Sequence, residues 1–351
     1  MLNRWKQNLS AMRNAQRFTA FYQGCDLKLS TGAVLRVTAK ATYRSPRPVG
    51  LRFARHAFIT EVSAGDQTMT GFGEDSSKLL AISKSIAEGV ERVVFKHYKA
   101  QGLGTVTSNG WAAHLSPEQA HQSAVEELIE RDAVLSHWLC QIPMLEVSEP
   151  SWPKWLKAWT ANELSLGTKY RRLRVLVSTK GYLPSVTTVL CSEQGHAVMS
   201  HASDGRLENA VSKALVETCR IAELSEFPET VQSAKSLLDG ASSGWTPEDH
   251  AYVYAHHLAF PEWIFGETLS WSEIQATWND SYSSFKREAF EHSFELAADG
   301  ALSVGFCTSK KVQTLFFGPT HDAKSQGLLN VARLGKIASS EDWNFLPHCI
   351  A

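Results

Sequence analysis

The chain carries two copies of a Glu-x-x-Glu-Arg motif, a spacing of carboxylates that suits divalent-metal binding. The copies, Glu88-Gly-Val-Glu91-Arg92 and Glu127-Leu-Ile-Glu130-Arg131, lie 39 residues apart (127 minus 88). On a helix, residues three and four apart share a face, so each motif places two carboxylates beside a guanidinium. Two such faces brought together would gather about four carboxylates, a ligand set for Mg²⁺, which enzymes commonly share with a substrate phosphate. The alternative is a solvated helix face.

A third, degenerate copy favours the chemical interpretation. The segment 83–91 (SKSIAEGVE) matches the segment 212–220 (SKALVETCR) at an offset of 129 (217 minus 88). Ser, Lys and the first Glu are kept, and Arg220 stands where the first copy has Glu91. An arginine at this position is suited to hold an anion such as phosphate. Solvation alone explains three related polar helix faces poorly.

Composition limits the classes of function. The 351 residues include 35 basic and 36 acidic ones, for a net charge of -1, so no global basic field attracts nucleic acid or membrane. The N-terminal segment 1–18 lacks the apolar stretch of a signal peptide, and no apolar run in the chain is long enough to span a bilayer. The sequence therefore predicts a soluble, cytoplasmic protein that binds neither nucleic acid nor membrane.

The cysteines give no sequence signal for a metal site. The chain has six of them, widely scattered, with no CxxC and no Cys/His cluster at zinc spacing. We therefore expect free thiols in a reducing compartment and no structural zinc.

The order of elements predicts an α+β fold with mixed or antiparallel sheets and packed helices. Apolar and polar residues alternate over 27–44 around Ser30-Thr-Gly32, which predicts a hairpin. Strands are expected at 56–62 and 67–71, before the first motif helix at about Ser76. Further predictions are strands at 173–179, 184–192, 195–200, 301–308 and 312–317, helices at 207–224 and 327–337, and a turn-rich surface segment at 226–263. No inter-domain linker is evident, so residues 1–351 are expected to form a single catalytic unit.

The second motif helix has a defined start and an unexpected acid. Ser116 is suited to be the N-cap, with Pro117 at the first helical position and Gln119 completing a capping box. At about 100° per residue, Asp132 falls inside the apolar arc of this helix, where an unpaired charge is costly. Three explanations stay open: a helix end, a partner Arg or Lys, or a buried carboxylate that orients the site.

These motifs together resemble the YcaO family. The segment 107–113 (TSNGWAA), followed by 127–133 (ELIERDA), matches the family pattern of an SNG-x-AA segment leading into an ELIERDA helix. The stretch 71–92 occupies the place of the family's first ATP-binding motif, and the SKALVETCR helix that of the third. The resemblance covers about residues 68–225 and is weaker toward the C-terminus.

The resemblance implies a YcaO-type fold with an ATP site between the motif helices and without a Walker A loop. If the roles known in the family apply to this chain, the four motif glutamates would hold Mg²⁺ against the phosphates of ATP. Ser, Lys and Arg side chains would complete the nucleotide-binding site. The implied metal ligands are Glu88, Glu91, Glu127 and Glu130. The other implied nucleotide-binding residues are Ser83, Lys84, Arg92, Arg131, Glu217 and Arg220, with Ser83 and Lys84 the weaker candidates. No catalytic Ser/His/Asp set is required.

The family's typical chemistry is ATP-dependent activation of a peptide backbone amide, which yields an azoline or a thioamide during maturation of a ribosomal peptide. The resemblance therefore implies a peptide substrate. Because the chain is too short for a sizeable recognition domain before its first strand, it also implies a separate partner that binds the leader peptide. Homodimerisation stays open.

Two departures from the family pattern bear on the chemistry. Phe72 stands where many members have a lysine between two glycines, and the segment 345–351 has one proline where many azoline-forming members end in PxPxP. These differences favour a thioamide-forming or an inactive member. The alternative function is thus a non-catalytic relative that binds a nucleotide or a partner protein. Both Glu-x-x-Glu-Arg motifs are complete, which favours the enzyme, because a site without function would be expected to lose clustered charges that are costly to bury.

Overall fold

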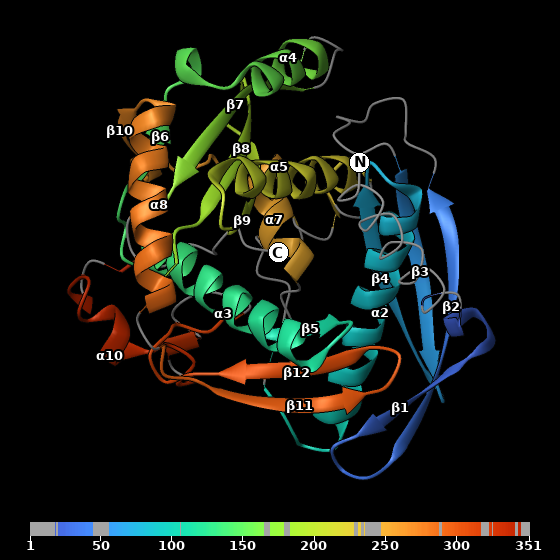
Figure 1. Cartoon of the computed structure of the whole chain (residues 1–351). Coiled ribbons are helices and arrows are strands. Elements are labelled where there is room, and N and C mark those ends of the chain that lie inside the picture. The colour runs from blue at the N-terminus through green and yellow to red at the C-terminus, as the bar shows by residue number, and fades with distance from the viewer. Residues whose placement is uncertain are drawn as a thin grey trace. The chain divides into compact units, whose positions relative to one another are not determined.

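The structure is a computed structural model of the whole chain (Figure 1). The residues that it describes are 18, 20–44, 56–105, 107–164, 169–178, 183–227, 231–232, 235, 247–287, 290–316, 323–324, 326–340 and 343–344. The C-terminal segment 345–351 and its single proline lie outside the described residues.

The chain divides into two compact units. Unit 1 comprises Met1–Pro46, Ala54–Leu128 and His292–Ser309, and unit 2 comprises Arg47–Phe53, Ile129–Glu291 and Lys310–Ala351. One long helix, α3 (Pro117–Leu139), contributes residues to both units. That residues 1–351 work as a single catalytic unit stays a prediction.

Unit 1 is built on a seven-stranded sheet in the order β4-β3-β2-β1-β11-β12-β5, in which every pairing is antiparallel. The strands are β1 (Cys25–Leu29), β2 (Val34–Arg44), β3 (His56–Ala64), β4 (Gln67–Asp75), β5 (Trp111–His114), β11 (Ser293–Asp299) and β12 (Ser303–Thr308). The predicted hairpin is confirmed, since Cys25 pairs with Val37 and Lys28 with Val34. The two edge strands, β4 and β5, leave outward backbone groups that the sheet does not use.

Helix α2 (Lys78–Ala100) packs unusually close to strand β4, and two glycines make this possible. A Cβ atom added to Gly71 would lie 2.1 Å from the carbonyl oxygen of Ser85, and one added to Gly73 would lie 2.0 Å from that of Ala81. Neither backbone atom can yield unless helix and strand separate. The Gly-Phe-Gly segment therefore serves close helix-to-strand packing, with Phe72 directed to the other face of the strand.

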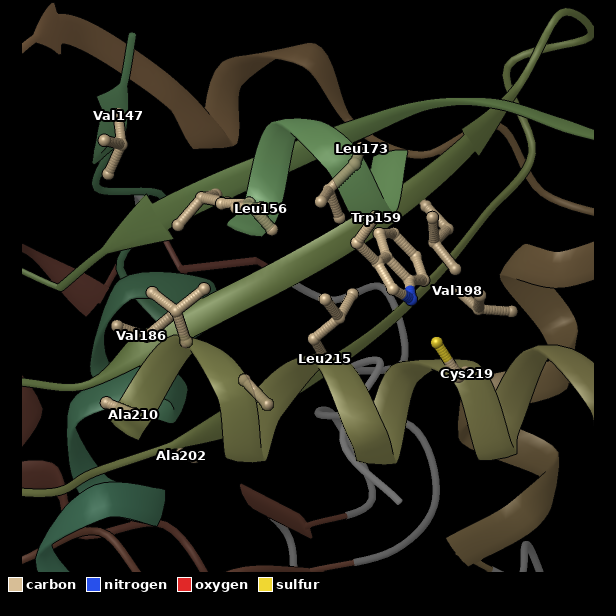
Figure 2. Close-up of a cluster of buried hydrophobic side chains, with 14 of the residues drawn as sticks. Val147, Leu156, Trp159, Leu173, Val186, Val198, Ala202, Ala210, Leu215 and Cys219 are labelled. Atoms are coloured by element: carbon tan, nitrogen blue, oxygen red, sulfur yellow. The ribbon is translucent and has the colours of Figure 1, made fainter. Parts of the chain in front are cut away.

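Unit 2 contains a five-stranded sheet in the order β10-β6-β7-β8-β9, antiparallel except for the β10–β6 pair. Its strands are β6 (Met144–Val147), β7 (Tyr170–Val177), β8 (Val186–Ser192), β9 (Ala197–Ala202) and β10 (Phe265–Leu269). Its helices are η1 (Glu149–Ser151), α4 (Lys154–Glu163), α5 (Leu207–Leu224), α7 (Pro247–His256), η2 (Glu262–Ile264), α8 (Trp271–Arg287) and α10 (Val331–Leu334). Figure 2 shows Leu156 and Trp159 of α4 and Leu215 and Cys219 of α5 in one buried apolar cluster with side chains of the sheet.

Most of the predicted segments are confirmed, and three are corrected. Helix α5 has the predicted bounds, and the amide of Gln119 donates to the Ser116 hydroxyl at 3.3 Å, as expected of an N-cap at the start of α3. The strand predicted at 312–317 is wrong for its described residues, because 312–316 are irregular and the Gln313 amide donates to Asp132 instead of to a strand. The helix predicted at 327–337 is only the short α10. The segment 226–263 contains α7, because His250 and Val253 bury an apolar side that its polar neighbours obscure in the sequence.

None of the helices within the described residues combines the length and the apolar character that crossing a lipid bilayer requires.

Candidate active site

In unit 1, Glu88 and Arg92 of α2 form hydrogen bonds with backbone groups at the outer edge of strand β4. The amide of Phe72 donates to Glu88 at 2.6 Å, and the guanidinium of Arg92 donates to the carbonyl of Thr70 at 2.8 Å. Arg92 also forms an ion pair with Glu88 at 2.7 Å, one helical turn away. Both oxygens of Glu88 are thus held in position, and each keeps a second lone pair for another ligand.

Glu91 is the centre of a cluster of like charges. It accepts a hydrogen bond from the amide of Ala113 in edge strand β5 at 3.2 Å. Burial raises the pKa of Glu91 well above that of an ordinary carboxyl, and the negative charges of Glu127 and Glu88 raise it further, against the opposing effects of Arg92 and the amide. Within unit 1, the structure therefore brings two other predicted metal ligands, Glu88 and Glu127, into electrostatic range of Glu91.

Lys84 and Ser83 are engaged at the start of α2. The ammonium of Lys84 lies 2.8 Å from Asp75 and donates to the carbonyl of Glu74 at 3.3 Å, while the Ser83 hydroxyl donates to the carbonyl of Leu79 in its own helix at 2.9 Å. Asp75 in turn accepts the amide of Ser77. These contacts stabilise the beginning of the helix, which is a structural role.

In unit 2, the second motif is organised around His201. Glu130 accepts the amide of Ser203, just beyond edge strand β9, at 2.6 Å, and the guanidinium of Arg131 contacts Nε2 of His201 at 2.7 Å. A guanidinium can only donate, so this nitrogen accepts. Burial and the charge of Arg131 lower the pKa of His201 well below its ordinary value. Glu130 lies 3.7 Å from His201. Because His201 is neutral, it does not compensate the negative charge of the Glu130 carboxylate.

The third motif is an ion pair. Glu217 and Arg220, one turn apart on α5, are in direct contact. The side chain of Arg220 is about one-fifth exposed (20%), so the guanidinium is held and partly desolvated, as a phosphate-binding arginine commonly is. Glu217 positions this guanidinium.

Three of the motif glutamates are held by the same kind of backbone hydrogen bond. Glu88, Glu91 and Glu130 each accept a backbone N–H from an edge strand or the residue just beyond one: Phe72 in β4, Ala113 in β5 and Ser203 after β9. A carboxylate fixed in this way loses less conformational entropy when it binds a ligand. That Glu130, which belongs to unit 2, meets the three acids of unit 1 stays a prediction.

Asp132 is accounted for by the partner-arginine explanation. Its carboxylate is fully buried, lies 2.9 Å from Nη2 of Arg333 and accepts the amide of Gln313 at 2.7 Å. Its role within unit 2 is to anchor the segment after residue 310 to helix α3.

Comparison with known proteins decides the family. A model of the YcaO cyclodehydratases, described as ATP- and Mg²⁺-binding, matches residues 81–298, more than half of the chain. The chain belongs to the YcaO family. No curated protein matches this YcaO protein by sequence.

Solved structures of low sequence identity share its α+β fold. A heterocyclase in complex with substrate and cofactor is 14% identical with a TM-score of 0.56; the match covers 96% of this chain and 57% of the heterocyclase. YcaO from Methanopyrus kandleri, bound with AMPPCP and Mg²⁺, is 13% identical with a TM-score of 0.51, covering 78% of this chain and 85% of that one. The E. coli microcin synthetase McbBCD complex with pro-MccB17 bound is 12% identical with a TM-score of 0.52, covering 89% and 95%. This YcaO protein thus spans just over half the length of the heterocyclase.

ATP and Mg²⁺ are the cofactors of the family, and the donor set of this YcaO protein fits them. Glu88, Glu91 and Glu127 supply hard carboxylate oxygens, the ligand type that Mg²⁺ prefers, and their mutual repulsion is relieved when a divalent cation binds. Two of the three are already oriented by backbone amides.

Two residues without a role in the sequence analysis join the candidate site. Asn109, in the SNG segment of the YcaO motif, is buried, and within the described part of the chain neither polar atom of its amide has a hydrogen-bond partner. A buried amide in this state is costly unless a ligand satisfies it. His201 is the second, and no pattern in the sequence signals it. For Asn109 the motif itself is the signal.

Proposed function

We propose that this YcaO protein uses ATP and Mg²⁺ to activate a backbone amide of a peptide substrate in the maturation of a ribosomally made peptide. The observation that carries the proposal is the cluster of Glu88, Glu91 and Glu127, in which burial and like charge raise the pKa of Glu91. A solvated helix face would not have this environment. The proposal is strengthened by membership of an ATP- and Mg²⁺-binding family.

Each group of residues has a distinct task in this proposal. When bound, ATP supplies a phosphoryl group for the amide oxygen and Mg²⁺ neutralises the charge of the phosphates. The four glutamates Glu88, Glu91, Glu127 and Glu130 hold the metal. Arg131 and Arg220 hold phosphate oxygens, whereas Arg92 acts as a scaffold cation, since its contacts go to Glu88 and the β4 backbone.

Ser83 and Lys84 have a secondary part in the proposal. Both are occupied by local contacts at the start of α2, so they assist nucleotide binding mainly by stabilising the helix that carries Glu88 and Glu91. The remaining catalytic contribution is positioning: the enzyme aligns the amide oxygen with the phosphoryl group and excludes water. A second protein that binds the leader peptide completes the system.

The outcome of amide activation depends on the nucleophile. Attack by a Cys, Ser or Thr side chain of the substrate, followed by loss of the amide oxygen, forms an azoline; attack by a sulfide equivalent forms a thioamide. The matched family model describes cyclodehydratases, which supports the azoline, whereas Phe72 and the single proline of 345–351 favour the thioamide. High-resolution mass spectrometry of the peptide distinguishes the two, since an azoline lacks one water and a thioamide has sulfur in place of oxygen.

The first experiment measures nucleotide binding. ATP with Mg²⁺ should raise the melting temperature, because a ligand that binds only the folded state stabilises it. Replacing Glu130 with Gln keeps the size and helix propensity but removes a hard anionic ligand, so Mg²⁺-ATP affinity and phosphate release should fall sharply while folding holds. Glu126→Gln is the matched control, since Glu126 is a neighbour on α3 that accepts a hydrogen bond from the Gln122 side chain at 2.9 Å.

The results separate the enzyme from its alternatives. If Glu130→Gln and Glu126→Gln both bind Mg²⁺-ATP as the parent does, the motif is a solvated face and the proposal fails. If the parent binds Mg²⁺-ATP but releases no phosphate with any peptide and partner supplied, the chain is the non-catalytic, nucleotide-binding relative.

A further inference from the structure

A second cluster of metal-binding side chains lies in unit 1, on residues that the proposed function does not use. The cluster consists of His121 of α3, His292 just before β11 and Cys307 of β12. Each offers one ligand atom, a ring nitrogen or the thiol sulfur, and these three atoms lie within 4.8 Å of one another. The three come from segments far apart in the chain, 171 residues in the case of the two histidines. Cys307 is fully buried and both histidines are half-buried.

The sheet register explains why these side chains converge. Cys307 lies directly opposite Phe294 in the β11–β12 pair, so both side chains project from the same face of the sheet. His292 is two residues before Phe294 and follows the same alternation. His121 completes the group from the helix, because its ring packs on that of Phe294 with centroids 4.6 Å apart.

The two histidine rings are in direct contact through their Nε2 atoms. Their Nε2 atoms are 2.7 Å apart, so one ring donates to the other and both cannot carry a proton at this contact. Burial lowers the pKa of His121, and the neighbouring His292 lowers it further. The contact therefore leaves one of the two Nε2 atoms without a proton, as a metal-binding nitrogen must be.

We propose that His121, His292 and Cys307 form a Zn²⁺ site that is separate from the carboxylate cluster and ties helix α3 to the β11–β12 hairpin. Two imidazoles and a thiolate are borderline and soft ligands that suit Zn²⁺ and not Mg²⁺. Three protein ligands leave the fourth tetrahedral position to a water. This site goes beyond the proposed function and does not depend on it.

Binding of Zn²⁺ requires a small movement of the two histidine rings and the transfer of protons to solvent. A tetrahedral ion with bonds of about 2.0 to 2.1 Å to nitrogen holds two ligand nitrogens about 3.3 Å apart, so the rings would separate by about 0.6 Å. The ring that donates moves its proton from Nε2 to Nδ1 through solvent. Cys307 loses its thiol proton to solvent as the Zn–S bond forms. Burial raises the pKa of this thiol to about 12, so the metal must drive the deprotonation.

The test uses the full chain, stripped of metal and kept in excess Mg²⁺ to occupy carboxylate sites. Titration with Zn²⁺ against a chromophoric chelator should find one tight site per chain. Co²⁺ in its place should give tetrahedral d–d bands and a thiolate-to-cobalt charge-transfer band. His121→Asn and Cys307→Ala should each weaken Zn²⁺ binding at least about 100-fold, and Cys307→Ala should abolish the charge-transfer band.

Matched controls show whether the effect is specific. Cys191→Ala removes a partly buried thiol in unit 2, and His97→Asn removes a histidine on α2 that contacts Gln101; both should bind Zn²⁺ as the parent does. Glu91→Gln should also bind Zn²⁺ normally, which separates this site from the ATP site. The half-buried His121 variant serves if Cys307→Ala does not fold.

Two outcomes would overturn the site. One is a parent chain that binds no Zn²⁺ at micromolar concentration, in which case the two histidines share a proton only. The other is Zn²⁺ affinity that persists in both His121→Asn and Cys307→Ala, which would place the ion elsewhere.

Discussion

Units 1 and 2 contain the same substructure, a β-hairpin followed by a helix, with different residues at the positions that carry chemistry. In unit 1 it is β3–β4–α2 and in unit 2 it is β8–β9–α5, and the helices begin at an offset of 129 residues (207 minus 78). The helix starts are built alike: Asp75 pairs with Lys84 at 2.8 Å and Asp204 pairs with Lys213 at 2.7 Å, at the same offset.

The hairpin is joined to the helix by a buried hydroxyl pair in both copies. Thr60 of β3 contacts Ser85 of α2 at 2.6 Å, and Thr188 of β8 contacts Thr218 of α5 at 2.7 Å. The two pairs occupy different positions of the repeat, since the offsets are 128 (188 minus 60) and 133 (218 minus 85), so the copies reach the same kind of contact through non-equivalent residues. The third motif seen in the sequence is thus one part of a repeated ββα substructure.

The differences mark what is specialised in each copy. Unit 1 has Glu91 where unit 2 has Arg220, so one copy presents a second acid and the other a cation. Unit 1 also has Gly73 where unit 2 has Ala202, which is buried in the same apolar cluster as Ala210 (Figure 2). The glycine lets α2 lie closer to its strand than an alanine would permit. We infer that close packing positions the α2 acids on the edges of the sheet.

The largest effect is expected from breaking that packing. Gly73→Ala should lower the free energy of unfolding by about 3 kcal/mol or more, since the new methyl group would meet backbone and not a movable side chain. Ala202→Gly, the reverse change in unit 2, should cost only about 1 kcal/mol. Chemical denaturation of both variants measures the difference. Equal losses would show that the two copies pack alike.

The next largest effect distinguishes the role of Glu91 in unit 1 from that of Arg220 in unit 2. Glu91→Gln should weaken the Mg²⁺ dependence of ATP binding by about 100-fold, because a metal ligand is lost. Arg220→Gln should lower ATP affinity by about 10-fold at every Mg²⁺ concentration, because a phosphate contact is lost. ATP titrations at several Mg²⁺ concentrations separate the two. An Arg220→Gln protein whose ATP binding depends on Mg²⁺ less strongly than that of Glu91→Gln would reverse these assignments.

The hydroxyl pairs should behave identically. Thr60→Val and Thr188→Val each remove one buried hydrogen bond but leave the partner hydroxyl bonded to its own helix, Ser85 to the Ile82 carbonyl and Thr218 to that of Ala214. Each variant should therefore lose about 1 kcal/mol of unfolding free energy. A loss confined to one copy would mean that the two pairs do not contribute alike to the stability of their hairpin–helix contacts.

The smallest effect concerns pH. Burial acts to raise the pKa values of Asp75 and Asp204, but the lysine partners and the amides at the helix starts outweigh it and hold both below the ordinary value. A lowered folded-state pKa gives stability that is present above the unfolded-state pKa and lost as the pH falls through the folded one.

Asp75→Asn and Asp204→Asn should thus each cost about 1 kcal/mol or less at pH 7. The cost should shrink below about pH 4 and vanish once the pH has passed the lowered folded-state pKa. Urea denaturation between acid and neutral pH measures this. A difference from the parent that persists in acid would assign the effect to packing instead of charge.

Much of this protein was determined by local sequence. The motif helices, the hairpin at 27–44 and the N-cap at Ser116 depend on periodicity and on hydrogen bonds between near neighbours, and all were predictable. The same holds for the pairing of carboxylates along one helix face, because helical spacing alone places Glu88 beside Arg92.

Tertiary structure decided everything that depends on contacts between distant segments. Asp132 could have been a helix end, an ion pair or an orienting acid until Arg333 was found 201 residues away. Likewise, the absence of zinc spacing in the sequence argued against a zinc site, yet sheet register brings His292 and Cys307 to the same face, beside His121. Short-range patterns encode helices and turns because those bonds are local, whereas partners far apart in the chain are chosen by strand order and register, which no local pattern specifies.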